Sequence, residues 1–497
     1  MATFEYFGGF PAEIKTKILH LVDDPVTCTA VCREWQEILE TKTFKQIQLS
    51  QRRLGDFARI VQGRRRKLVS HIWLRIEFPR YDCRRCGEIE SRKEENENSL
   101  ILGHAIEGLF VILSNWKKPH DLNPKGLTLE LCQFSPSDSE HTFKDHNFQH
   151  DPYSEPPEAF RMLAAPQEMP VGYQSDPLHS WQGGVRLPFS WPIMQSSIRV
   201  ATAPACPAQF NPPEVDVVTG LLIRQQYFRD FTPITLAAIF KSLVALEHIM
   251  YERASVMYPG SNHIQRGHVM LHTGFKGTLS CLPETLKQLS IYESDKKAFR
   301  DRIRGPAPAI WRLESALAIK QGSQNLEQLS TSYFIDAENF FQCGSSSWKW
   351  NKLKNLVLTS NLLDPNEAPK RVNDLLEAAG ATARNMPNLG TMEIWHGKGS
   401  THGCIFRFST DDNSSTITWH STWEIKLEDR VIDSWKKTVD QNTRHENLGV
   451  VFEALQLNLV YPASVLSHLK LKDLVVCPIS FRQIQLIGKP IIASPLS

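Results

Sequence analysis

The stretch that decides the fold is Leu353-Lys354-Asn355-Leu356-Val357-Leu358-Thr359-Ser360-Asn361-Leu362-Leu363. Leucine stands at its first, fourth, sixth and eleventh positions, and asparagine stands at its ninth. Side chains two positions apart lie on the same face of a strand, so Leu356 and Leu358 would share a core. The Asn361 side chain can bond the backbone that turns away from the strand. The stretch therefore predicts a buried strand that ends in a sharp turn.

Weaker copies of this pattern occur along the chain, with helical stretches between them. The copies are Val69/Ile72/Leu74, Leu246/Ile249/Tyr251, Leu286/Leu289/Ile291, Leu326/Leu329, Leu389/Met392/Ile394, Phe452/Leu455/Leu457 and Leu471/Leu474/Val476. The helical stretches are residues 233–243, 298–303, 307–318 and 371–379. The pattern resembles the leucine-rich repeat, whose leucines line a core between stacked units. Its spacing is irregular, about 20 to 60 residues against 20–29 in regular repeats. An ordinary α/β domain with leucine-rich parallel strands is the alternative.

The remaining stretches complete the expected α/β fold. Residues 69–78 and 127–131 predict strands, residues 99–116 a helix, and the polar residues 82–98 a surface loop. Residues 414–425 predict an added strand that forms a hairpin with residues 404–408. Prolines punctuate residues 150–213, which predicts a long loop. The expected domains are a helical unit over 1–50, a first α/β region over 51–149, this loop over 150–213, and an irregular solenoid of alternating helices and strands over 214–497.

The first fifty residues form a separate helical pattern. Ile14, Ile18, Leu19 and Val22 recur at the spacing of an amphipathic helix. Residues 26–39 carry a second apolar stripe that includes Val31 and Trp35. A unit this small cannot bury all of its apolar surface alone. Some of that surface is expected to meet a partner or the rest of the chain.

Four elements in this segment resemble the F-box in order and spacing. They are Phe10-Pro11-Ala12-Glu13-Ile14, Ile18-Leu19, Val31-Cys32-Arg33-Glu34-Trp35 and Phe44-Lys45-Gln46-Ile47. Phe10 replaces the usual leucine, and the link between the first two helices is short and lacks the usual leucine pair. The resemblance implies a three-helix F-box that docks on the Skp-type adaptor of a cullin-RING (SCF) ubiquitin ligase. The residues it assigns to adaptor binding are Phe10, Pro11, Ile14, Ile18, Leu19, Val31, Cys32 and Trp35. The alternative is a helical cap that closes the core of the following domain.

The overall layout also resembles a large group of F-box proteins in filamentous fungi. The shared elements are Tyr81-Asp82-Cys83-Arg84-Arg85-Cys86, Pro136-Ser137-Asp138-Ser139-Glu140-His141 and residues 221–226. That group has no generally assigned substrate. The resemblance therefore implies a substrate-recognition subunit with an unknown protein target and no catalysis of its own. A leucine-rich-repeat-like scaffold without a role in ubiquitin transfer is the alternative function.

The composition limits which binding partners and which cellular compartment we expect for this chain. Lys and Arg number 56 and Asp and Glu 54, for a formal net charge of +2, so no overall field favours nucleic acid or a membrane surface. The N-terminal residues do not resemble a signal peptide, and no apolar run is long enough to span a bilayer. The ten cysteines are then expected to be reduced, in the cytoplasm or the nucleus. The basic run Arg64–Lys67 could be an import signal or a phosphate-binding patch, but a solvated helix face is favoured.

Cysteine and histidine supply the only candidate chemistry that the sequence offers. Cys83 and Cys86 have the spacing of zinc ligands or of a redox pair. Zinc would need two further ligands, for which His141, His146, His150 and Cys132 are the candidates. Because no second Cys-x-x-Cys occurs, we expect a turn with two thiols and no metal or cofactor. The histidine-rich residues 141–151 are expected to form a polar surface loop, and no phosphate loop or nucleophile elbow occurs. An enzyme with a metal site built from these groups is a third, less favoured function.

Overall fold

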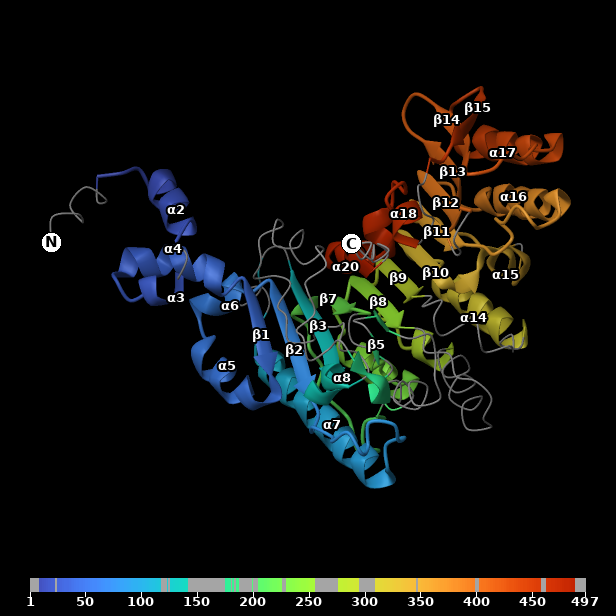
Figure 1. The fold of residues 1–497 in the computed structure, drawn as a ribbon. Coiled ribbons are helices and arrows are strands. Elements are labelled where there is room, and N and C mark those ends of the chain that lie inside the picture. The colour runs from blue at the N-terminus through green and yellow to red at the C-terminus, as the bar shows by residue number, and fades with distance from the viewer. Residues whose placement is uncertain are drawn as a thin grey trace, which may run out of the picture.

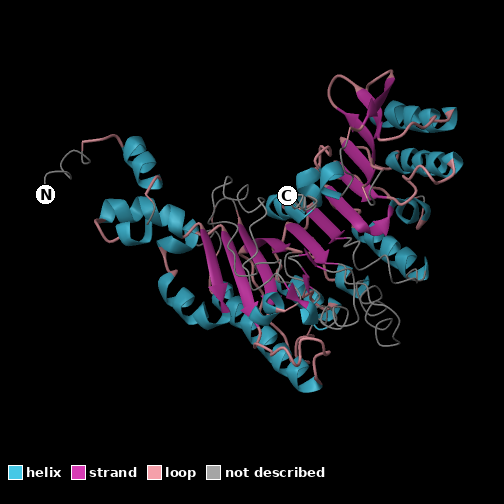
Figure 2. Cartoon of the chain, viewed as in Figure 1, coloured by secondary structure: helices cyan, strands magenta, loops and turns pink. Residues whose placement is uncertain are grey.

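The computed structural model describes residues 9–22, 25–117, 123, 126–141, 175–179, 181–182, 185–186, 199, 204–225, 229–254, 276–294, 309–345, 347–397, 402–456 and 462–487. One sheet of twelve strands dominates the fold, and its strands follow the order of the chain (Figures 1 and 2). The strands are β1 (Gln46–Ser50), β2 (His71–Glu77), β3 (Leu127–Phe134), β7 (Val218–Ile223), β8 (His248–Ala254), β9 (Gln288–Ser294), β10 (Gln328–Asp336), β11 (Asn355–Thr359), β12 (Thr391–His396), β13 (Cys404–Thr410), β14 (Ser415–Ser421) and β15 (Leu448–Ala454).

The sheet is mostly parallel. Only β13 runs antiparallel, to β12 on one side and to β14 on the other. A parallel neighbour requires a crossover, and helices supply most of the crossovers. These helices are α7 (Arg92–Ser114), α11 (Pro233–Ser242), α14 (Ala309–Gly322), α15 (Ala337–Gln342), α16 (Pro369–Ala383) and α17 (Asp429–Asn442). The prediction of a mixed α/β fold is therefore confirmed, and so is the hairpin of β13 with β14.

Alternation along each strand divides the sheet into two faces. The side chains on one face of the sheet pack with the crossover helices in a single large core. This core includes Leu289 of β9, Leu329 of β10 and Leu356 of β11. We call this the outer face. The opposite set, which includes Tyr292 and Trp395, packs with a C-terminal segment in a second core. We call this the inner face. The apolar positions of most copies that form strands, such as Leu289 and Ile291 of β9, lie on the outer face.

The C-terminal segment, residues 462–487, lies against the inner face (Figure 1). It contains α18 (Pro462–Leu466), α19 (Lys472–Val475) and α20 (Pro478–Ile487). The prediction of a strand at Leu471/Leu474/Val476 is therefore wrong. Leu471 and Leu474 are three positions apart, which is helical spacing, and α19 packs across β9 and β10 instead of extending the sheet.

Two further sequence predictions need correction. Helix α7 begins at Arg92, not at residue 99, because Ser91 and Glu94 form a capping box that starts the helix inside the expected loop. The Asn361 side chain does not bond the turning backbone; its amide donates to the Asp336 carboxylate at 3.2 Å. Asp336 also caps α15 by accepting from the Glu338 N–H at 2.9 Å. An acidic cap thus fixes the turn.

Two strands of the sheet, β15 and β7, also differ from the sequence pattern. Strand β15 lies where the Phe452 copy was predicted, but Phe452 is exposed. Strand β15 is an edge strand of the described sheet, so no neighbouring strand shields Phe452 on that side. Strand β7 was not predicted as a copy, although Leu221 and Ile223 lie in the core. Most of the proline-rich residues 150–213 lie outside the described residues. The parts described include β4 (Ser175–Asp176), β5 (Trp181–Gln182) and β6 (Val185–Arg186), which form a small antiparallel sheet.

Within the described residues 9–22 and 25–43, three helices project from the β1 end of the sheet (Figure 1). They are α2 (Ala12–His20), α3 (Pro25–Cys28) and α4 (Arg33–Thr43). Helices α5 (Leu54–Ile60) and α6 (Arg64–Leu68) connect β1 to β2, and α8 (Pro136–Glu140) follows β3. In the part of the chain that the structure describes, no helix has the length and apolar character needed to cross a membrane.

Candidate functional site

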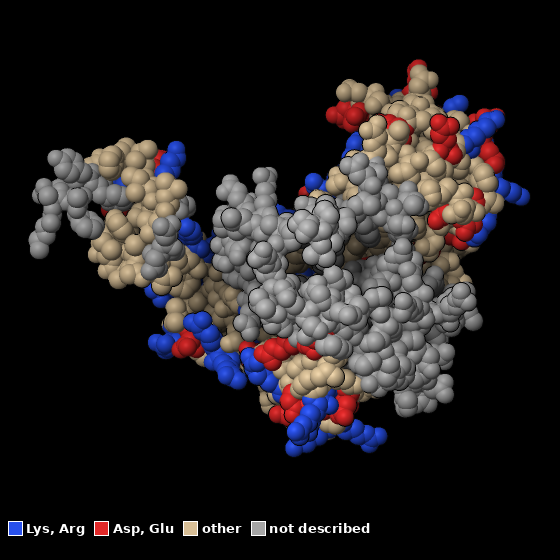
Figure 3. Space-filling view, in the orientation of Figure 1, with Lys and Arg blue, Asp and Glu red and all other residues tan. Residues whose placement is uncertain are grey.

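The N-terminal helices present apolar side chains to solvent. Phe10 is 44% exposed, Ile14 and Ile18 are 39% exposed, and Val31 is 47% exposed. Pro11 and Cys32 are exposed as well. On the side seen in Figure 3 these helices show mainly uncharged surface. Six of the eight residues predicted to bind an adaptor are therefore accessible on the same small helical unit, and we call this set of residues the N-terminal apolar face.

The other two residues predicted to bind an adaptor are not exposed. Leu19 is fully buried, and Trp35 is half-buried. A salt bridge of 2.8 Å joins Lys15 of α2 to Glu34 of α4, which fixes the two helices relative to each other. Leu19 thus shapes the face without being part of its surface.

A buried carboxylate fastens the helical unit to the sheet. The Glu40 carboxylate of α4 forms salt bridges with two arginines of α6, Arg64 at 2.7 Å and Arg65 at 2.8 Å. Burial by itself would raise the pKa of Glu40, but hydrogen bonds from Arg65, Gln36 and Arg64 lower it overall. The basic run at 64–67 therefore lies on a short helix, where at least two of its arginines serve this attachment.

The inner face of the sheet is polar and charged as well as apolar. Glu130 of β3 and Arg224, just after β7, form an ion pair of 2.6 Å with no exposed side chain surface. Glu393 of β12 accepts from Arg407 Nε of β13 at 2.7 Å. Buried charges of this kind require partners, and neighbouring strands provide them.

The C-terminal segment occupies the inner face over its β8–β13 part. The Glu393 carboxylate accepts the backbone N–H groups of Lys470 and Leu471, each at 3.0 Å. The Glu252 carboxylate accepts the N–H of Cys477 at 2.7 Å. Apolar side chains of the segment cover Trp395 and Tyr292. A protein target cannot reach this part of the inner face while the segment is in place.

Four potential ligand residues, three of them candidates from the sequence, meet near the first strands. The ligand atoms of Cys83, Cys86, His141 and His179 all lie within 4.8 Å of one another. Nε2 of His179 is 3.4 Å from Sγ of Cys83 and 3.3 Å from Sγ of Cys86. Burial, and then the neighbouring Cys83 thiol, raise the pKa of Cys86 to about 11 in the absence of a cation. We call this group the Cys/His cluster.

Sequence reasoning found three of the four members. Cys83, Cys86 and His141 were candidates, but His179 was not, because it stands alone in the proline-rich stretch. Its only local signal is Asp176, three residues earlier, whose carboxylate lies 2.7 Å from Nδ1 of His179. Cys132 was also a candidate, but it is buried on β3 and receives the Trp73 indole N–H at 3.2 Å. His146 and His150 lie outside the described residues.

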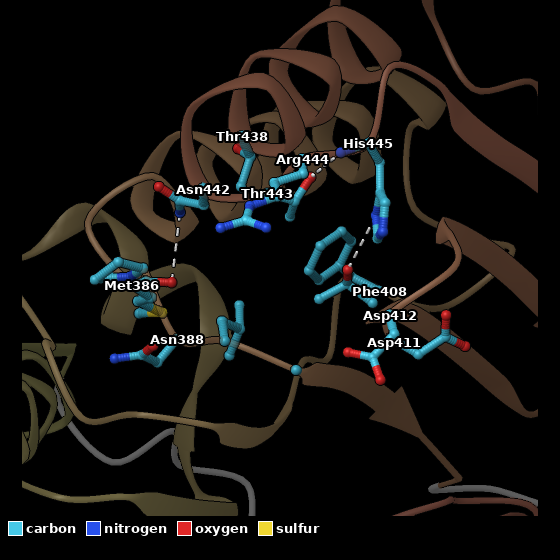
Figure 4. Close-up of a pocket in the computed structure, with 14 residues that line it drawn as sticks. Met386, Asn388, Phe408, Asp411, Asp412, Thr438, Asn442, Thr443, Arg444 and His445 are labelled. Atoms are coloured by element: carbon cyan, nitrogen blue, oxygen red, sulfur yellow. Dashed lines mark hydrogen bonds between the residues drawn. The ribbon is translucent and has the colours of Figure 1, made fainter.

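A pocket of about 590 Å³ opens at the far end of the sheet (Figure 4). Arg444 and Asn442 line it from the end of α17, opposite Met386, and Asp411 lies across from them. The Asp411 carboxylate accepts the backbone N–H groups of residues 413 and 414 at 2.9 Å, so its main role is to hold the β13–β14 turn.

A serine and a histidine beside this pocket resemble a catalytic pair only in distance. Ser415 Oγ lies 2.7 Å from Nδ1 of His445. Ser415 is almost fully buried, and its hydroxyl is also 2.9 Å from Oγ1 of Thr410. The pair fastens the hairpin to the end of α17, and we assign it no reaction.

Comparison with known proteins is informative for one part of the chain. Residues 281–477 match a family described as a family of unknown function, DUF6546. No curated protein matches the chain. The matched residues run from just before β9 to Cys477, just after α19 in the segment that covers the inner face. The N-terminal apolar face and the Cys/His cluster lie outside them.

Proposed function

We propose that this chain is the substrate-recognition subunit of an SCF-type cullin-RING ubiquitin ligase. Its N-terminal helices would dock on the Skp-type adaptor, and its sheet domain would hold a protein target. The observation that carries the proposal is the N-terminal apolar face. Exposed apolar residues that gather on one small unit are typical of a protein-binding surface. Three of the four F-box-like sequence elements fall on or directly before the same helices, and the fourth, residues 44–47, runs from the end of α4 into β1.

The exposure of Ile14, Ile18 and Pro11 supports docking over the alternative of a helical cap. A cap would pack these residues against the following domain, whereas here they face solvent. The buried Leu19 and Leu39 belong to the unit's own packing. The helices are thus held together by one set of apolar residues and leave a second set uncovered.

On this proposal the sheet domain is an irregular leucine-rich-repeat-like solenoid. Strands in chain order, with helices along one face and leucines between them, support that description. Ubiquitin transfer would be carried out by the other subunits. The chain would contribute proximity, because a bound target meets the charged transfer enzyme at a high effective concentration.

The proposal is tested by binding of purified full-length chain to a Skp-type adaptor. Ile14→Glu and Val31→Glu each place a charge on the N-terminal apolar face without disturbing buried residues. Loss of one interface anchor costs about 2 kcal/mol, or about thirtyfold in affinity. We expect each variant to weaken adaptor binding by at least that factor.

The matched control is Val111→Glu, the same kind of change at an exposed valine of α7. It should bind the adaptor like wild type. Equal binding by all variants, or no binding by wild type, would contradict the proposal. The latter result would favour the scaffold without a role in ubiquitin transfer.

A further inference from the structure

We propose that Cys83, Cys86, His141 and His179 bind one zinc ion as a structural site. This inference is independent of the proposed function, because it concerns how a long insertion is fixed to the sheet. A Cys₂His₂ donor set is typical of structural zinc. Four protein ligands also leave no coordination position for a substrate, so the site is not a catalytic one.

The spacing of the ligand atoms fits tetrahedral zinc. Zinc–sulfur bonds of about 2.3 Å and zinc–nitrogen bonds of about 2.0 Å place S and N about 3.5 Å apart at tetrahedral angles. The distances from Nε2 of His179 to the two sulfurs are 3.4 Å and 3.3 Å. The limit of 4.8 Å over all four ligand atoms is compatible with a single ion at their centre.

Hydrogen bonds set the histidine tautomers that zinc needs. A carboxylate can only accept, so Nδ1 of His179 carries the proton that points to Asp176, and Nε2 presents its lone pair to the thiols. Nε2 of His141 lies 3.4 Å from the backbone carbonyl oxygen of Tyr81, which makes Nδ1 the unprotonated nitrogen of that ring. Carboxylate and carbonyl partners of this kind orient metal-binding histidines.

The parallel sheet explains why residues so far apart in sequence converge. Strands β2 and β3 are neighbours and end at the same edge, where α8 lies (Figure 1). Cys83 and Cys86 follow β2, and His141 follows β3. His179 comes from the 3₁₀ turn Pro177–His179 between β4 and β5. The ion would therefore join three loops, one of which belongs to the proline-rich stretch.

Charge and second-layer contacts are consistent with a divalent cation. Two thiolates neutralise Zn²⁺, and the buried ion then carries no net charge with its ligands. Arg199 binds the backbone around the Cys83–Cys86 turn. Its guanidinium donates to the backbone carbonyls of Arg85 and Glu88 at 3.5 Å and 3.4 Å. It also pairs with Glu94 at 2.6 Å, so its charge is balanced.

The first experiment measures zinc in full-length protein purified without added metal. We expect one zinc per chain by elemental analysis, and none after Cys83→Ser/Cys86→Ser. Cys281→Ser removes a half-buried thiol elsewhere and should keep the zinc. His179→Gln should lose zinc, while His104→Gln, at an exposed position of α7, should keep it.

Cobalt substitution keeps the proposal testable if the cysteine variants do not fold. Chelator-stripped wild type titrated with Co²⁺ should develop thiolate charge-transfer absorption and the intense visible bands of tetrahedral cobalt, saturating at one ion per chain. Asp176→Ala should bind the same ion 10- to 100-fold more weakly, because the acceptor of the His179 Nδ1–H is lost. Wild type that holds no zinc and shows no tetrahedral cobalt spectrum would overturn the proposal. Unchanged affinity in Asp176→Ala would overturn the role of Asp176 in orienting Nε2 of His179 as a ligand.

Discussion

At the scale of single residues, two ion pairs of nearly equal length lie in opposite surroundings. Glu130 and Arg224 are 2.6 Å apart and fully buried on the inner face. Lys287 and Glu247 are 2.7 Å apart, and their side chains are 50% and 35% exposed. Breaking a buried pair leaves an uncompensated charge and costs about 3–5 kcal/mol, whereas an exposed pair is worth about 0–1 kcal/mol.

We therefore expect Glu130→Gln to lower the free energy of unfolding by several kcal/mol and Glu247→Gln to change it little. The measurement is urea unfolding followed by tryptophan fluorescence. Similar urea midpoints for the two variants would show that the Glu130–Arg224 ion pair stabilises the fold no more than the exposed pair does.

Glu94 gives the chain a defined response to acid. Burial would raise its pKa, but hydrogen bonds from the backbone and hydroxyl of Ser91, together with Arg199, lower it from the ordinary 4.5 to about 2. A lowered folded-state pKa means that the carboxylate stabilises the fold above about pH 4.5 and loses that effect as the pH falls toward 2.

The corresponding prediction concerns Glu94→Gln. Its melting temperature should lie below that of wild type at pH 6, and the gap should narrow steadily as the pH falls below 4.5. Glu97→Gln, at an exposed position of the same helix, should show no such pH-dependent gap. A gap that stays constant with pH would exclude the Glu94 charge as its cause.

The capping box at the start of α7 is an example of a local feature that can be predicted from the sequence. Ser91-x-x-Glu94 is a helix-start signal that is present in the sequence, yet the charged residues around it suggested a loop. The contact between Asp336 and Asn361 had no such signal, because the two residues belong to different turns. Local caps can be found from spacing, whereas caps between turns depend on the fold.

At the scale of elements, the C-terminal segment is the part whose packing matters most for the inner face. Leu466 is fully buried in the second core. Truncation of a buried leucine costs about 2–5 kcal/mol through lost contacts and the cavity left behind. We expect Leu466→Ala to lower the urea midpoint clearly.

Leu313→Ala is the matched control, since Leu313 lies on α14 with nearly half of its surface exposed. It should leave the midpoint within the small range typical of surface changes. Equal shifts for the two variants would mean that the segment contributes no packing to the inner face.

Strands were easier to predict than this segment, for a physical reason. Within their strands, Leu289 and Ile291 alternate with period two, as do Leu356 and Leu358, and all four face a continuous core. This alternation is what allows a strand to be predicted from sequence. Leu471 and Leu474 carry the same residue type, but their partners lie on an already complete sheet. Residue type alone did not distinguish a thirteenth strand from a helix packed across existing strands.

At the scale of the whole molecule, the parallel order of strands determines which residues meet. The Cys83–Cys86 turn and His141 could be linked only after β2 and β3 were known to be neighbours that end at one edge. His179 is distant in sequence from both. The N-terminal apolar face, in contrast, was predictable residue by residue because it lies within one short unit. The sequence thus predicted the class of the fold and the exposed helical face, but not the Cys/His cluster.

The position of the C-terminal segment has a consequence for the order of folding. Each strand of the sheet pairs with the next one along the chain, so contacts within the sheet close comparatively local loops. The segment instead bonds residues 185 and 225 positions earlier, at Ser290 and Glu252. Closure over such separations carries a larger entropic cost than pairing of successive strands. During synthesis the apolar part of the inner face therefore stays uncovered until residue 477 has left the ribosome, and that interval is when this chain most needs protection from aggregation.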